Sequence, residues 1–242
     1  MARHVSEDTY AQSKIDDLAD DVAIVTSDYK MKILSCFYRE TQKKWFGKRG
    51  TNLLGFMITT NSPDEADKLQ GVKDVQFIFM VTDDSLTDAW EVACAKAMVY
   101  EEFLPDHVKK VRFWTDGAGC FKSKTHRVFQ PFWKHWTGVE EIELRITPAG
   151  NGKSQLDGSF GRLNFVLHGA VDEGHSYFDA PSILNSISQS TGLAATKVRS
   201  FLPDRSSQVK GDIESIRFES VLLTLLDPNR DEKDNSVQAF HH

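Results

Sequence analysis

Cysteine and long apolar runs are both scarce in this chain, and each absence excludes a class of protein. Only 3 of the 242 residues are cysteines, and Cys36, Cys94 and Cys120 form no Cys-x-x-Cys pair. Neither a disulfide framework nor a structural zinc site is therefore indicated. No apolar run is long enough to cross a bilayer, and the N-terminal MARHVSEDTYAQSK lacks the apolar core of a signal peptide. We expect an intracellular protein without a membrane partner, or a piece of a longer one.

The chain also lacks the excess of positive charge that is typical of proteins coating nucleic acid, because its formal net charge is −6. Acidic residues gather near the ends, at 16–21 and 227–234. Basic residues gather in the middle, in three clusters: Lys43, Lys44, Lys48 and Arg49; Lys109, Lys110 and Arg112; and Lys122, Lys124 and Arg127. Such runs are most often solvated surface, yet they leave a phosphate-binding face open as an alternative.

The composition is that of a globular protein, with 40% hydrophobic and 11% aromatic residues and enough length for one large core. No internal repeat is present. We expect residues 1–20 to be a flexible acidic segment and residues 21–226 to form one domain. Within that domain we place the core at about 22–175 and an extension at 176–226, and we expect a disordered tail at 227–242.

Apolar periodicity predicts five strands and three helices. The strands are expected at 22–26, 53–60, 75–81, 111–115 and 142–147, and MKILSCFY at 31–38 continues or restarts the first. A capping pattern, Ser85-x-x-Asp88, opens a helix that stops before Pro105. A second helix over 125–136 is broken or bent at Pro131, and a third runs from about 155 to 171.

Three strands followed by alternating helices and strands predict an α/β fold with a mixed β-sheet and flanking helices. This is the order of ribonuclease H-like folds, in which the first and fourth strands are neighbours at the centre of the sheet. Acidic residues at the ends of those two strands would therefore meet.

Three aspartates occupy the places where such a fold would gather them. Asp28 follows the first strand, Asp116 ends the fourth, and Asp157 begins the third helix. Clustered carboxylates repel one another unless they are protonated or neutralised. Two Mg²⁺ or Mn²⁺ ions would neutralise them and clamp the attacking and leaving oxygens of a phosphodiester. The alternatives are turn residues at Asp28 and Asp116 and a helix N-cap at Asp157.

Four blocks of sequence carry a resemblance that bears on this choice. They are SDYKMKI at 27–33, WFGKRG at 45–50, TDGAGCFKS at 115–123 and GNGKSQLDGSFG at 150–161. Together they resemble the catalytic domain of eukaryotic DDE/D transposases, including copies domesticated within larger proteins. The resemblance covers residues 22 to about 170, and no zinc finger or other DNA-binding module accompanies it.

The resemblance implies a ribonuclease H-like fold and a metal triad of Asp28, Asp116 and Asp157 that binds two Mg²⁺ or Mn²⁺ ions. It further implies phosphodiester cleavage or strand transfer, nucleic acid as the partner with DNA favoured over RNA, and a nuclear location. The alternative is a catalytically inactive, domesticated core that binds nucleic acid or a protein, either a host protein or a second copy of the chain.

Basic residues near the aspartates are candidates for contact with nucleic-acid phosphates. They are Lys30, Lys32, Lys48, Arg49, Lys122 and Lys153. For each of them singly, solvated surface is the alternative. Cys120 lies close to Asp116 but has no evident base partner, so we do not expect a thiol nucleophile.

Two further patterns point to other functions and are set aside. GNGKS suggests a P-loop, but Thr147 stands where that motif requires its first glycine. Residues 188–202 resemble a helix-turn-helix, yet the β-branched TKVRSF within them favours a strand. His168, Asp172 and His175, at or beyond the end of the third helix, are expected to be surface or capping groups.

Overall fold

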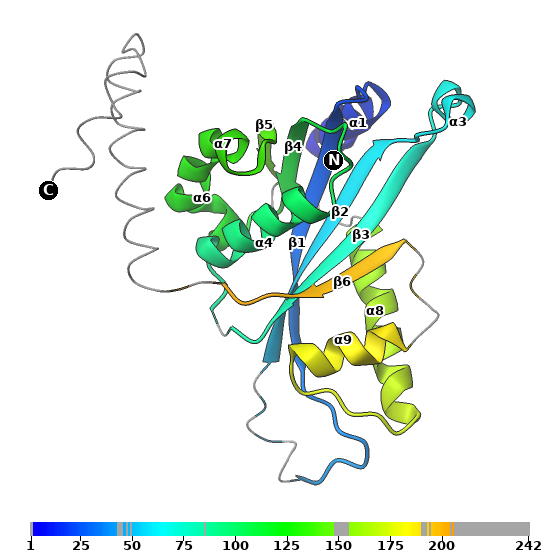
Figure 1. Cartoon of the computed structure of the whole chain (residues 1–242), viewed down its shortest axis with the longest axis vertical. Coiled ribbons are helices and arrows are strands. Elements are labelled where there is room, and N and C mark those ends of the chain that lie inside the picture. Colours follow the sequence, from blue (N-terminus) through cyan, green and yellow to red (C-terminus); the bar gives the residue numbers. More distant parts are fainter. Residues whose placement is uncertain are drawn as a thin grey trace, which may run out of the picture. The chain divides into compact units, whose positions relative to one another are not determined.

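The structure is a computed structural model of the whole chain (Figure 1). It describes residues 2–42, 46, 48, 50–84, 86–147, 155–189, 193, 195–203 and 205. The chain divides into two units, Met1–Pro203 and Asp204–His242, and the fold given below is that of the first. The predicted tail at 227–242 and nearly all of 204–226 lie outside the described residues.

Six strands form one mixed, open sheet in the order β5-β4-β1-β2-β3-β6 (Figure 1). The meander β1, β2 and β3 is antiparallel, β4 lies parallel to β1, β5 parallel to β4, and β6 parallel to β3. The strands are β1 (Val22–Leu34), β2 (Gly50–Asn61), β3 (Lys73–Thr82), β4 (Lys110–Thr115), β5 (Glu140–Ile146) and β6 (Thr196–Ser200). The predicted mixed α/β sheet is confirmed, with β1 and β4 as neighbours.

The helices are α1 (Ala2–Asp16), α3 (Glu65–Leu69), α4 (Ala89–Glu102), α5 (Gly119–Lys122), α6 (Lys124–Phe129), the 3₁₀ turn η1 (Gln130–Phe132), α7 (Trp133–Thr137), α8 (Gln155–Asp172) and α9 (Ala180–Ser188). The predicted break at Pro131 is confirmed, because this proline lies in η1 between α6 and α7. Within the described ranges, no helix combines the length and apolarity needed to cross a membrane.

Two predicted boundaries are wrong. The first strand does not end at Asp28, because its pairing with β2 continues to Leu34 past an irregularity between Lys30 and Ile33; the alternative that residues 31–38 continue this strand is confirmed as far as Leu34. The first helix after β3 does not open with a capping pattern at Ser85, which lies outside the described residues. It begins at Ala89, because the Asp88 carboxylate accepts the first-turn N–H groups of α4 and so acts as its N-cap.

Helices α8 and α9 cover one face of the sheet. Their apolar side chains share a buried cluster with those of β1, β2 and β3; its members include Ile33, Leu53, Phe79, Val81, Leu156, Phe160, Leu163, Ile183 and Ile187. Farther toward the start of β1 on this face, Ala11 and Ile15 of α1 pack on a cluster that contains Ile24 and Trp114. Residues 1–20, expected to be flexible, thus include a helix that contacts the core.

The opposite face is covered by the short helices between β3 and β5. Side chains alternate along a strand, so Tyr29 and Phe113 point away from the face that bears Ile24 and Trp114. The ring of Phe121, in α5, lies 5.9 Å from Tyr29 and 6.4 Å from Phe113. This aromatic cluster therefore holds the segment that follows β4 against the face of the sheet opposite α8.

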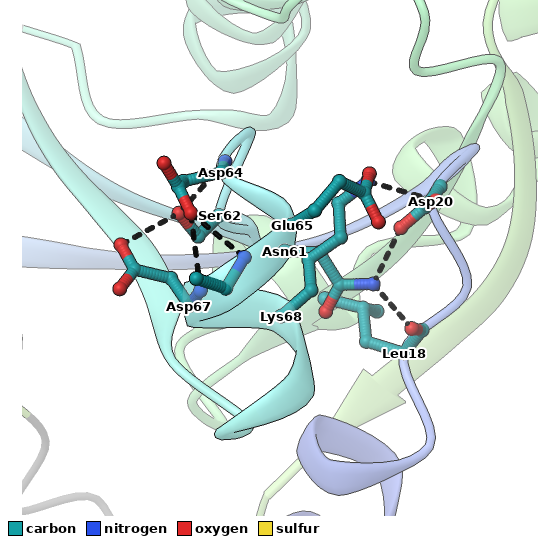
Figure 2. A network of polar contacts seen from close by, with 9 residues as sticks. Leu18, Asp20, Asn61, Ser62, Asp64, Glu65, Asp67 and Lys68 are labelled. Carbon is teal, nitrogen blue, oxygen red and sulfur yellow. Dashed lines mark hydrogen bonds and ion pairs between the residues drawn. The ribbon is translucent and has the colours of Figure 1, made fainter.

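A polar network holds the β2–β3 hairpin against the loop that precedes β1 (Figure 2). Asn61 Nδ2 donates to the carbonyl of Leu18 at 2.7 Å and to Asp20 Oδ1 at 2.9 Å. Lys68 of α3 reaches Asp20 Oδ2 at 3.2 Å and Glu65 Oε1 at 2.9 Å. The bond from Asn61 and then that from Lys68 lower the pKa of Asp20. This network fixes the hairpin tip beside the start of β1.

Candidate active site at three aspartates

Asp28 lies in β1, and Asp116 directly follows β4, the strand beside it. The parallel pairing of β1 with β4 runs to Ser27 opposite Thr115, so the two aspartates follow that pair at the same step. Neighbouring strands are about 4.8 Å apart, and side chains at matching positions point to the same face. Asp28 is partly buried and stands opposite Gly55 of β2. The register of the sheet therefore brings two carboxylates together on the face that carries α8.

The turn after β4 uses one oxygen of Asp116. Its Oδ1 accepts the backbone N–H of Ala118 at 3.0 Å, which is the geometry of an Asx turn. Asp116 is therefore a turn residue, as the alternative interpretation predicted. This role is compatible with a position beside Asp28.

Asp157 enters from the third direction, in the first turn of α8. It lies inside the helix, whose first residue is Gln155, and not before it as an N-cap would. Its side chain is exposed, whereas the neighbouring Leu156 is fully buried against the sheet. At the start of α8, the exposed carboxylate of Asp157 therefore lies next to Leu156, which packs against the sheet.

Electrostatics links the three positions. The pKa of Asp28 is raised from 3.8 to about 6, first by burial and then by the negative charges of Asp116 and Asp157. Each neighbour disfavours the ionised form of Asp28, so a nearby cation would be stabilised by all three. The charges of Asp116 and Asp157 thus act on Asp28.

The same aspartates do not form a ready-made set of metal ligands. Among the described residues, no group of three or more His, Cys, Asp or Glu side chains is placed to hold one metal ion. Mg²⁺, however, is commonly bound through one or two carboxylates, with water and substrate phosphates completing its shell. Carboxylate oxygens without thiol or imidazole are the donors that suit Mg²⁺ and Mn²⁺. The residues present thus fit a hard divalent cation held partly by substrate.

Two of the predicted basic residues lie beside the aspartates. Lys30 is partly buried two residues beyond Asp28, and burial lowers its pKa. Lys122 folds back over the turn after Asp116, since a Cβ at Gly117 would lie only 2.6 Å from its Nζ. Lys30 therefore lies near Asp28 along β1, and the Lys122 side chain lies over the turn that follows Asp116.

The remaining basic residues are less directly placed. Lys32 is exposed farther along β1, where its side chain lies over Gly50. Lys48 forms an ion pair with Glu40 Oε2 at 2.7 Å, with its side chain only 11% exposed, so its charge is balanced within the protein. Arg49 and Lys153 lie outside the described residues.

Sequence reasoning missed a buried carboxylate behind the site. Glu91 of α4 is fully buried, and its Oε2 accepts from Asn52 Nδ2 at 3.1 Å. Burial, followed by the charge of Glu91, raises the pKa of Tyr29, the residue after Asp28. An acidic residue within the apolar stretch AWEVACAKAMV is the signal that could have revealed it.

The positions set aside in the sequence behave as expected where the structure describes them. Residues 196–200 form β6 and not a recognition helix. His168, Asp172 and His175 are exposed at or after the end of α8. Burial raises the pKa of Cys120 to about 11, which keeps this thiol protonated and poorly nucleophilic.

No protein-family model matches the chain, and no curated protein matches it closely enough to count as a relative. Its function has to be inferred from the arrangement of its own residues.

Proposed function

We propose that this chain is a metal-dependent phosphodiester-cleaving or strand-transferring core of the DDE/D transposase type, acting on nucleic acid. The observation that carries the proposal is that Asp28 in β1 lies within the electrostatic reach of Asp116, in the turn after the neighbouring β4, and of Asp157 in α8, although the three are far apart in sequence. The central place of β1 beside β4 supports a ribonuclease H-like fold, since that fold gathers its acids there.

The proposed division of labour follows from position. Asp28 and Asp116 would hold Mg²⁺ or Mn²⁺ from the sheet, and Asp157 would complete the site from α8. Such ions polarise the scissile phosphate and stabilise the attacking and leaving oxygens. Lys30 and Lys122 would bind the phosphate oxygens on either side of the carboxylates. A cation at this site would compete with the proton on Asp28, so its binding should weaken as the pH falls below about 6.

A second function is favoured by a different observation. Within the described part of the chain, no group of three His, Cys, Asp or Glu side chains is placed to hold a metal ion. An inactive core needs no such group. In that case the chain would bind nucleic acid or a protein without cleaving anything. The net charge of −6 is also in keeping with a protein partner.

A nicking assay distinguishes the two functions. Supercoiled plasmid and single-stranded RNA would be incubated with Mg²⁺, Mn²⁺ or EDTA and with the parent protein, Asp116→Asn or Asp172→Asn. Asn keeps the oxygen that accepts from Ala118 N–H, so Asp116→Asn preserves the turn while removing charge. Asp172 is an exposed acid at the end of α8 and provides the matched control.

We expect divalent-dependent cleavage by the parent and by Asp172→Asn, and a loss of at least about 100-fold for Asp116→Asn. Equal cleavage by parent and Asp116→Asn would show that the aspartate assignment is wrong. Nucleic-acid binding without any divalent-dependent cleavage would favour the inactive core.

A further inference from the structure

Helix α8 lies directly against Gly55 of β2. A Cβ atom added at this position would lie 2.5 Å from Cζ and 2.6 Å from Cε1 of Phe160, and 3.0 Å from Cδ1 of Leu156. Separations this short are not tolerated between carbon atoms, whose optimal distance is about 3.5–4.0 Å. The helix therefore rests directly on the backbone of β2.

The glycine is needed for space and not for backbone conformation. Gly55 lies inside a regular antiparallel ladder, paired with Asp28 on one side and with Phe79 on the other. It does not have the positive φ that Gly71, Gly138 and Gly174 adopt. Glycine in a strand interior is less favourable than alanine, so we attribute the glycine at this position to the contact with α8.

The contacting side chains have little freedom to move aside. Leu156 and Phe160 are four residues apart on one face of α8 and are 0% and 6% exposed. The Phe160 ring stacks on Phe79 of β3, with centroids 5.5 Å apart and planes at 25°. A side chain at position 55 would consequently displace the helix itself and not merely rotate a ring.

The first turn of α8 also carries Asp157, directly beside Leu156. Gly55 stands opposite Asp28, so the contact between Gly55 and α8 is made at the level of the site. We infer that Gly55 is a positioning residue whose missing side chain sets the separation between Asp157 on α8 and Asp28 on β1. The inference rests on the proposed function, because it concerns how those two carboxylates reach a shared divalent cation.

The expected sensitivity is large. Mg²⁺ requires ligand distances of about 2.0–2.1 Å, and a misplacement of about 1 Å at a reacting centre costs about 100-fold. A methyl group at position 55 has to move the start of α8 by a comparable amount to reach normal contact.

The test measures Mn²⁺ binding directly, by electron paramagnetic resonance of the free ion, with and without a short single-stranded oligonucleotide, and the Mn²⁺ that the oligonucleotide binds by itself is subtracted. Four proteins are compared: the parent, Gly55→Ala, Gly161→Ala and Gly55→Ala/Phe160→Leu. Gly161 lies in the same helix, and no heavy atom is found within 4 Å of the place that a Cβ would occupy there, so it is the matched control. The leucine in the double variant lacks the ring atoms that face position 55.

We expect Gly55→Ala to weaken Mn²⁺ binding at least tenfold, Gly161→Ala to leave it unchanged, and the double variant to recover to within about threefold of the parent. Equal binding by parent and Gly55→Ala would overturn the inference alone. A parent that binds no Mn²⁺ with or without the oligonucleotide would overturn the proposed function, and the inference with it. Should Gly55→Ala not fold, the double variant decides: parental binding supports the inference, and weak binding overturns it.

Discussion

At the scale of single residues, Asp28 shows how a partly buried carboxylate beside like charges costs stability when it is ionised. This carboxylate is partly buried and lies in the field of two like charges, which together with burial raise its pKa to about 6. The folded state thus binds a proton more tightly than the unfolded chain, whose aspartates titrate near 3.8. The stabilising effect of that proton is complete below about 3.8 and is lost as the pH rises through about 6.

Replacing Asp28 with asparagine should therefore stabilise the metal-free protein. In EDTA at about pH 8 we expect the free energy of unfolding of Asp28→Asn to exceed that of the parent by about 1 kcal/mol, a value reduced for partial exposure. At about pH 4 the difference should nearly vanish, because the folded parent is then protonated. Urea denaturation at the two pH values provides the measurement, with Asp172→Asn as the control. A variant that is less stable than the parent at both values would contradict the like-charge argument.

His126 of α6 is a second residue whose protonation is opposed by its surroundings. Its ring lies 5.7 Å from that of Phe113 and 6.1 Å from that of Phe121. Burial, followed by the positive charge of Lys96, lowers the pKa of His126 from 6.5 to about 3. The unfolded chain therefore takes up a proton at this position that the folded protein does not.

The stability contributed by neutral His126 should be complete above about pH 6.5 and fall as the pH decreases toward 3. We expect His126→Leu to reduce the slope of unfolding free energy against pH in this window by up to about 1.4 kcal/mol per pH unit. Chemical denaturation at several pH values reads out this slope, and His168→Leu, which changes an exposed histidine, is the control. An unchanged slope in His126→Leu would show that other groups govern acid unfolding.

At the scale of elements, a buried ion pair joins α4 to β5. Lys96 and Glu141 form an ion pair with both side chains 0% exposed. Tyr100 donates its hydroxyl to Glu141 Oε2 at 3.3 Å, and the Lys96 ammonium lies 3.9 Å from the Phe113 ring centroid and 4.6 Å from that of Trp133. Burial lowers the pKa of Lys96 and raises that of Glu141, opposed in each case by the charge of the partner.

Removing only the cation should be far more harmful than removing both charges. We expect Lys96→Met to lower the free energy of unfolding by about 3–5 kcal/mol, because it leaves Glu141 buried and uncompensated. The double variant Lys96→Met/Glu141→Gln should recover most of that loss, since glutamine still accepts from Tyr100. Urea denaturation of the parent, both single variants and the double variant completes the cycle. Additive effects of the two substitutions would argue against coupling.

Element boundaries were predicted less well than element types. The strands at 53–60, 75–81 and 111–115 were recognisable because each is a short run dominated by apolar and β-branched residues, and all three are present in the sheet. The end of β1 was not, because whether Asp28 closes a strand or continues it depends on pairing with Gly55, which no local pattern encodes. The predicted start of α4 at Ser85 was also wrong. Serine and aspartate are both strong N-cap residues, and in the structure Asp88 caps a helix that begins at Ala89.

At the scale of the whole molecule, the face that carries the aspartates is divided between two helical supports. Helix α1 packs at Ile24 and Trp114, and α8 packs over Gly55 and Phe79, with Asp28 between them along the sheet. The positions of the aspartates relative to one another thus depend on how closely α1 and α8 pack against β1. The experiment on Gly55 addresses one of these approaches.

The order of the strands and the mixed sheet followed from the sequence alone, as did the choice of three aspartates as candidates, because period, turn residues and acidic positions are local properties. The separation of the aspartates did not, nor did the burial of Glu91, Lys96 and Glu141, because both arise from surfaces that meet only after the chain has folded. A glycine in a strand looks like a weak position in the sequence. Only the tertiary structure reveals that Gly55 lies beneath Phe160, where the absence of a side chain brings a carboxylate of α8 toward one of β1.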